Sequence, residues 1–166
     1  MSGKLYFGPR QPAKANSSAD ADMNADTAAY HDLCCYTLTH GDRAFIHQHV
    51  VDAFAAQDAR ADDKPIRLTF ALVGLYLHVE RGFTGREVQL AHMKLARKKR
   101  QWPALQIPTD RGEISAATVF AAEPGIARDD QIHQWTVSVW QAFAENRAAI
   151  EQLLQEHGIS GVHSLR

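Results

Sequence analysis

Hydrophobic residues recur every three or four positions over most of this chain, and no segment alternates apolar and polar residues as a half-buried strand would. Five long segments carry the helical period: residues 27–40, 45–57, 66–81, 84–100 and 130–157. A shorter segment at residues 115–122 predicts a minor helix. We therefore predict an all-α fold, a bundle of four or five main helices.

Start and stop signals agree with these segments. Gly82 follows the third segment, where glycine commonly ends a helix. Pro65 comes just before that segment, at a first-turn position that tolerates proline. Thr84 and Glu87 have the spacing of a capping box, and Ser115 can cap the short helix.

The N-terminal residues 1–26 have a different pattern. They contain two prolines, paired serines and alternating alanine and aspartate, and few residues that a core could bury. We predict an extended, flexible tail over residues 1–26 and a single helical domain over residues 27–166.

The second segment, residues 45–57, is the one around which we expect the rest to be organised. At about 100° per residue, its apolar residues fall on one side: Ile46, Val50, Ala53 and Phe54. His47 and Gln57 fall near the two edges of that sector, whereas His49 and Asp52 point elsewhere. Because buried polar groups need hydrogen-bond partners, His47 and Gln57 are candidate functional residues.

The third segment, residues 66–81, is apolar almost all round, which is typical of a helix at the centre of a core. Gly74 and Ala71 lie on one strip of it, and their small size would let a neighbouring helix approach closely.

Composition narrows the class of protein. The formal net charge is −1, which gives no overall attraction to nucleic acids or anionic membranes. No apolar run approaches the ~20 residues of a membrane span. Cys34 and Cys35 are adjacent and predict no disulfide framework. We expect a cytoplasmic protein that does not enter a membrane.

Three histidines on consecutive helices are the strongest candidates for chemistry. His47, His78 and His92 all fall on faces predicted to be inward or between helices. A bundle can gather such imidazoles around a divalent metal such as zinc, with Asp52 or Glu80 as the nearest carboxylates. More often, such a residue is a hydrogen-bonded core histidine. The sequence has neither a Glu-x-x-His motif nor a pair of histidines at i,i+4, either of which would favour a metal site.

Other candidate sites are weaker. Arg111, in a predicted turn, could bind an anion at the mouth of a pocket. Cys34, Cys35 and Ser138 could act as nucleophiles, but none lies in a recognisable nucleophile elbow. The basic run at residues 97–100 is better explained as a helix end than as a nucleic-acid contact, so nucleic acid is an unlikely partner.

Four stretches together carry a resemblance to a known family. They are residues 47–57 around Val51-Asp52-Ala53-Phe54, Leu72-Val73-Gly74-Leu75-Tyr76, Trp102-Pro103-Ala104-Leu105 with Pro108 and Gly112, and Trp135 with Val139-Trp140. The chain resembles an uncharacterised bacterial family of unknown function, from about residue 30 to the end of the last helix. The resemblance implies a helical fold and assigns no activity.

Three of the candidate residues, His47, Asp52 and Gln57, fall on the pattern of that family. Some relatives have a histidine near the position of Ala71, and others begin with cysteines in a metal-knuckle arrangement. Neither feature is present here. A metal site that depended on them would be missing.

Two functions remain open from the sequence. The first is a pocket for a small ligand or divalent metal between the second, third and fourth helices. It would be lined by His47, His78 and His92, with Asp52, Gln57 and Arg111 orienting the ligand. The second is a homodimer formed through the C-terminal helix, without catalytic activity. Whether the protein is an enzyme is uncertain, and no reaction follows from these residues.

Overall fold

A computed structural model describes residues 17–97 and 101–159. Its helices are α1 (Ser17–Thr39), α2 (His47–Gln57), α3 (Pro65–Arg81), α4 (Gly85–Ala96), α5 (Ala116–Ala121), α6 (Ile126–Ala142), the 3₁₀ turn η1 (Ala144–Asn146) and α7 (Arg147–Glu156). No strand occurs in the described ranges. The prediction of an all-α bundle is confirmed.

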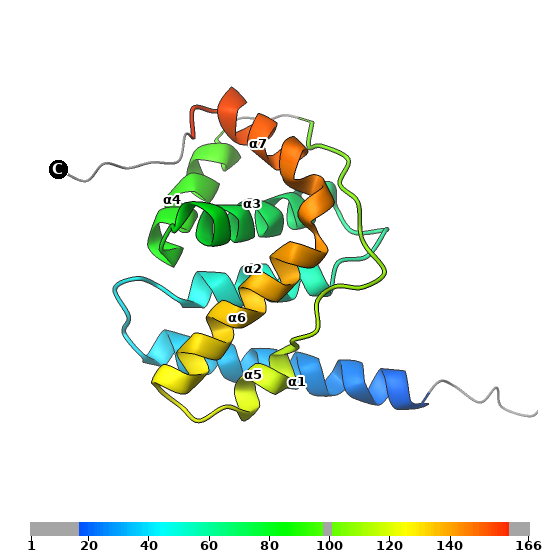
Figure 1. Cartoon of the computed structure of the whole chain (residues 1–166), viewed down its shortest axis with the longest axis vertical. Helices are drawn as coiled ribbons and strands as arrows, with labels where there is room; N and C mark the ends of the chain where they lie inside the picture. The colour runs from blue at the N-terminus through cyan, green and yellow to red at the C-terminus, as the bar shows by residue number, and fades with distance from the viewer. Residues whose placement is uncertain (1–16, 98–100, 160–166) are drawn as a thin grey trace, which may run out of the picture.

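The helices pack around α2 and α3. In Figure 1, α1, α2 and α3 lie one above another, and α6 runs diagonally across them. Contacts join α2 to α1, α3, α4 and α6, and α3 also contacts α4 and α7. The short helix α5 packs against α1 and α6. The core therefore has α2 and α3 at its centre.

The capping signals have the roles that the sequence predicts. The Thr84 hydroxyl accepts a hydrogen bond from the Glu87 backbone N–H, and the Glu87 carboxylate accepts one from the Thr84 backbone N–H. Ser115 caps α5, Pro65 occupies the first turn of α3, and Gly82 ends α3 with a φ of 68°. These local signals fix where α3, α4 and α5 begin or end.

The first helix begins earlier than predicted. α1 starts at Ser17, so residues 17–26 are helical and not part of a tail. Three of these ten residues are alanine, which has the highest helix propensity. This part of α1 can therefore be helical although it contains few apolar residues for a core. Asp26 also ties this part of α1 to the fold, because its carboxylate accepts a hydrogen bond from the Ala117 backbone N–H at 2.9 Å. The rest of the predicted tail, residues 1–16, lies outside the described residues.

The predicted helix at residues 130–157 is in fact two helices. α6 ends at Ala142, η1 follows, and α7 begins at Arg147. Asn146, buried at this junction, accepts a hydrogen bond from the Gln106 backbone N–H at 2.7 Å and donates one to the Gln106 carbonyl at 2.9 Å. The connection between α4 and α5 thus holds the bend, a long-range contact that helical periodicity cannot reveal.

The buried side of α2 is the predicted one only in part. Val50 and Ala53 are buried as expected, but so are His49 and Asp52, whereas Ile46 and Phe54 are only half-buried. Because helices pack on several sides of α2, its inward surface is much wider than a single apolar stripe. The close approach predicted at Gly74 is confirmed, since the Asp52 carboxylate occupies the space of a Cβ there.

Among the helices that the structure describes, none combines the length and the apolar composition that crossing a membrane requires.

Candidate functional site

The three predicted metal ligands have separate surroundings. His47 Nδ1 lies 2.9 Å from the Thr37 hydroxyl, and His92 Nε2 lies 2.9 Å from the Phe70 carbonyl oxygen. His78 contacts a different set of residues. No group of three or more His, Cys, Asp or Glu side chains in the described part of the chain is arranged to hold a metal. The structure therefore does not bring His47, His78 and His92 together.

Gln57 and Arg111 do lie together, away from these histidines. Gln57 Nε2 donates to the carbonyl oxygens of Arg111 and Ile114, at 3.2 and 2.8 Å, and its Oε1 accepts from Trp135 Nε1 at 2.8 Å. Arg111 in turn donates to the Gln57 carbonyl at 2.6 Å. The two residues line a hollow of about 430 Å³ that also includes Phe54. Their hydrogen bonds fasten the segment 110–114 to α2.

Asp52 is a buried carboxyl group between α2 and α3. Its side chain is 3% exposed, and Oδ1 accepts a hydrogen bond from Gln48 Nε2 at 3.0 Å. Oδ2 has no hydrogen-bond partner. Burial raises the pKa of Asp52 well above its ordinary value, with a smaller opposing effect from the Gln48 hydrogen bond.

A different set of histidines forms a continuous string. The His49 ring stacks on the His78 ring with centroids 3.6 Å apart, and His78 Nε2 lies 3.1 Å from His133 Nδ1. The three residues come from α2, α3 and α6. His49 is 5% exposed, whereas His133 is on the surface. We call these residues the histidine string; it links the core to the outer face of the molecule.

A backbone carbonyl fixes the hydrogen positions of two members of this string, His78 and His133. His78 Nδ1 lies 2.9 Å from the Phe83 carbonyl oxygen, which can only accept, so Nδ1 carries the proton. In a neutral pair, His78 Nε2 is then the acceptor and His133 Nδ1–H the donor. The remaining nitrogen of His133, Nε2, keeps its lone pair and can accept a proton or a hydrogen bond.

The inner part of the string is uncharged at neutral pH. Burial, followed by the neighbouring His78 and His133, lowers the pKa of His49 to about 3. Burial also lowers the pKa of His78, although its hydrogen bond to the Phe83 carbonyl acts in the opposite direction. His49 Nδ1 is buried without a hydrogen-bond partner.

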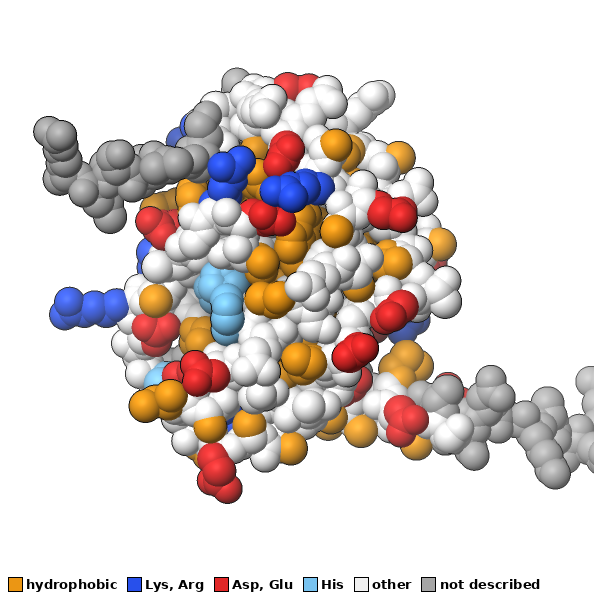
Figure 2. Space-filling view, viewed as in Figure 1, with side chains coloured by type: hydrophobic (Ala, Val, Ile, Leu, Met, Phe, Trp, Pro, Cys, Tyr) orange, Lys and Arg blue, Asp and Glu red, His pale blue; other side chains and the backbone are white. Residues whose placement is uncertain are grey.

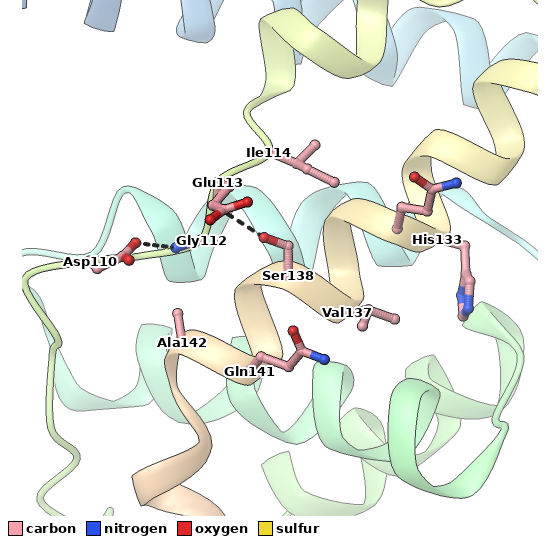
Figure 3. A pocket seen from close by; sticks show the side chains of 10 residues that line it. Asp110, Gly112, Glu113, Ile114, His133, Val137, Ser138, Gln141 and Ala142 are labelled. Carbon is pink, nitrogen blue, oxygen red and sulfur yellow. Dashed lines mark hydrogen bonds between the residues drawn. The ribbon is translucent and has the colours of Figure 1, made fainter.

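His133 lies at one end of a groove, which we call the α6 groove. Its volume is about 550 Å³, and its walls are the segment 110–114 and the face of α6 from His133 to Ala142. Figure 3 shows His133 and Asp110 at opposite ends, with Ser138 and Glu113 between them. The Glu113 backbone N–H donates to the Ser138 hydroxyl at 3.0 Å, which joins the two walls.

The segment passes close to α6 because of Gly112. Its φ of 99° favours glycine, and a Cβ there would press against Ser138. The Gly112 N–H donates to the Asp110 carboxylate at 3.0 Å. Gly112 and the Gln57 hydrogen bonds therefore set the position of this wall.

The surface of the groove has a distinct chemical character. Its lining contains the carboxylates of Asp110 and Glu113, the amides of Gln134 and Gln141, and the His133 ring, with no lysine or arginine. In Figure 2 the pale-blue histidines form a patch beside α6 on this face. The groove can accept hydrogen bonds from a small polar molecule and favours one that is not negatively charged.

Sequence reasoning missed two members of the string. His49 is expected to point away from the core, and His133, which is exposed on α6, is not among the candidates from the sequence. No spacing within one helix could have paired either with His78. Only the crossing of α6 over α2 and α3 brings them together (Figure 1).

The fold and this site define a class: an all-helical protein with a polar surface groove that ends at a chain of imidazoles. The sequence pattern of a family of unknown function, DUF5946, matches residues 25–144, and the chain belongs to this family. The matched range contains the histidine string and both walls of the α6 groove. Comparisons with curated proteins and with solved structures found no match.

Proposed function

We propose that the protein binds a small polar ligand in the α6 groove, with His133 Nε2 as the acceptor that orients it. The observation that carries this proposal is the hydrogen-bonded pair of His78 and His133, which ends in a groove of about 550 Å³. A surface histidine normally rotates freely. Here Nδ1–H of His133 is hydrogen-bonded to His78, which restrains the ring and leaves Nε2 as the acceptor for a ligand.

The lining supports a ligand that donates hydrogen bonds and is neutral or positively charged. Asp110 and Glu113 supply negative charge, and Val137 and Ile114 supply apolar contact area. A short aliphatic amine or a polyol fits this combination, whereas a dicarboxylic acid would be repelled.

Amide chemical shifts in solution NMR test the proposal. Putrescine, glycerol and succinate are added separately, and the backbone signals of Glu113 and Ser138 are followed. We expect shifts with putrescine or glycerol and none with succinate. In the variant Gln141→Trp, an exposed lining residue is enlarged to fill the groove, and the shifts should disappear. Gln155→Trp, an exposed change on α7, is the matched control and should retain them. Shifts that survive Gln141→Trp would contradict the proposal.

Pairing of two copies through the C-terminal helix remains a prediction from the sequence. A molar mass from light scattering tests it separately from ligand binding: the mass of two chains would support pairing, and the mass of one chain would contradict it.

A further inference from the structure

The two ring nitrogens of the His78–His133 pair lie at the separation of two ligands on one metal ion. His78 Nε2 and His133 Nδ1 are 3.1 Å apart, and the rings are perpendicular with centroids 5.2 Å apart. For bonds of about 2.0–2.1 Å, two nitrogens on one ion are about 2.9 Å apart at a right angle and about 3.4 Å apart at the tetrahedral angle. The observed distance lies between these values.

The second nitrogen of His78 is held as metal-bound histidines commonly are. Its Nδ1–H donates to the Phe83 carbonyl oxygen at 2.9 Å, which fixes the tautomer and leaves Nε2 with a lone pair for a metal bond. Burial keeps this imidazole neutral, and a neutral imidazole is the form that binds metal.

The pair is also reachable from solvent. His133 is exposed and lines the α6 groove, so that an ion can approach along the groove and keep water in its other coordination positions. The described residues supply no third His, Cys, Asp or Glu ligand, so any such site is open rather than closed.

We propose that His78 Nε2 and His133 Nδ1 form a two-imidazole site for a divalent transition-metal ion, open to the α6 groove. Imidazole ligands favour Cu²⁺ most, then Zn²⁺ and Ni²⁺, whereas Mg²⁺ and Ca²⁺ prefer oxygen ligands. Both imidazoles bind in the neutral form. The Nδ1 proton of His133 passes to solvent and Nε2 gains one, so that no net proton is released.

The proposed metal site is independent of the organic ligand proposed for the α6 groove. It is therefore tested with the metal ion alone. Cu²⁺ is titrated into full-length protein without a His tag. Calorimetry gives affinity and stoichiometry, and electron paramagnetic resonance counts the coordinated nitrogens. We expect one ion per chain with two nitrogens of the imidazole type, and no heat from Mg²⁺.

Three variants make the test specific. His133→Ala changes an exposed side chain and should weaken Cu²⁺ binding by at least about tenfold. His78→Gln should do the same, with helicity checked by circular dichroism. His31→Ala removes an exposed histidine on α1, outside the pair, and should leave the affinity unchanged. If His133→Ala binds Cu²⁺ as tightly as the parent protein, or the resonance shows fewer than two nitrogens, the site does not exist.

Discussion

Asp52 shows how one buried residue can lower the stability of the fold at neutral pH. Its carboxyl group faces Gly74 of α3, and one oxygen has no hydrogen-bond partner. Burial raises its pKa in the folded state above that in the unfolded state. Its contribution to folding is therefore fully present below the unfolded pKa of about 3.9, and it is lost as the pH rises.

We predict that Asp52→Asn stabilises the protein at pH near 7, because the neutral amide does not carry the charge that burial disfavours at this position. The amide keeps the shape of the carboxyl group and can still accept from Gln48. Urea denaturation at neutral and acidic pH measures the effect, and the gain should shrink toward low pH. A variant less stable than the parent at neutral pH would contradict this prediction, because the carboxyl group would then be more favourable at this site than a neutral amide.

A second change at the same contact tests its geometry. A Cβ at Gly74 would overlap the Asp52 carboxylate. Gly74→Ala should therefore destabilise the protein by about 2 kcal/mol or more, despite the better helix propensity of alanine. In the double variant with Asp52→Ala much of that loss should be recovered, which denaturation of all four proteins measures as a coupling energy. Equal losses in both backgrounds would mean that Asp52 does not occupy this space.

At the scale of single residues, the sequence predicted that polar groups of α2 face the interior, but it assigned them only in part. It nominated His47 and Gln57, and in the structure both are half-buried with hydrogen-bond partners. It placed His49 and Asp52 outside the inward sector although both are buried, because a single apolar stripe was assumed for a helix that is surrounded on several sides. Hydrogen-bond partners distant in the chain, such as Trp135 for Gln57, leave no trace in local spacing.

At the scale of elements, Arg128 joins α1, α5 and α6. Its guanidinium lies 4.8 Å from the Tyr36 ring centroid and 4.7 Å from that of Phe120. It also donates to the carbonyl oxygens of Phe120 and Ala122, at 2.8 Å each. A buried cation is thus stabilised by two rings and by the carbonyl groups at the end of α5.

We predict that Arg128→Lys destabilises the protein by about 2 kcal/mol, because an ammonium group cannot stack between two rings and reach both carbonyls. Thermal melting measures the loss. Arg147→Lys, a change at an exposed arginine of α7, is the matched control and should cost less than about 0.5 kcal/mol. A similar loss for both variants would mean that the stacked geometry contributes little.

The boundaries of the elements were predictable where a cap determines them and not where packing does. Thr84, Pro65 and Gly82 mark helix ends by chemistry that is local to the chain. The break between α6 and α7 depends on Asn146 bonding to Gln106, which lies forty residues away. Asn146 is a buried polar residue that needs a partner, and nothing in the local sequence around it points to Gln106.

At the scale of the whole molecule, the half-buried His92 makes the fold sensitive to acid. Burial lowers the pKa of His92 to about 4, although its hydrogen bond to the Phe70 carbonyl acts in the opposite direction. Between that pH and the ordinary value of about 6.5, the unfolded chain binds a proton that the folded chain does not. Stability therefore falls as the pH is lowered through this window.

We predict that His92 alone contributes a loss of about 3 kcal/mol between neutral pH and pH near 4. His92→Gln cannot titrate, yet its amide can still donate to the Phe70 carbonyl. Its stability should fall less steeply over the same window, as measured by urea denaturation at several pH values. Parallel pH profiles for the two proteins would show that His92 titrates normally in the fold.

Ligand binding by His133 Nε2 requires particular hydrogen positions on His78 and His133, and heteronuclear NMR of the imidazole nitrogens measures these positions directly. In metal-free protein at mildly alkaline pH, we expect both His78 and His133 to carry their proton on Nδ1, with Nε2 of each deprotonated. A proton on His133 Nε2 and a bare Nδ1 would reverse the hydrogen bond to His78. The groove would then offer a donor where we propose an acceptor, and the proposed mode of ligand binding would be wrong.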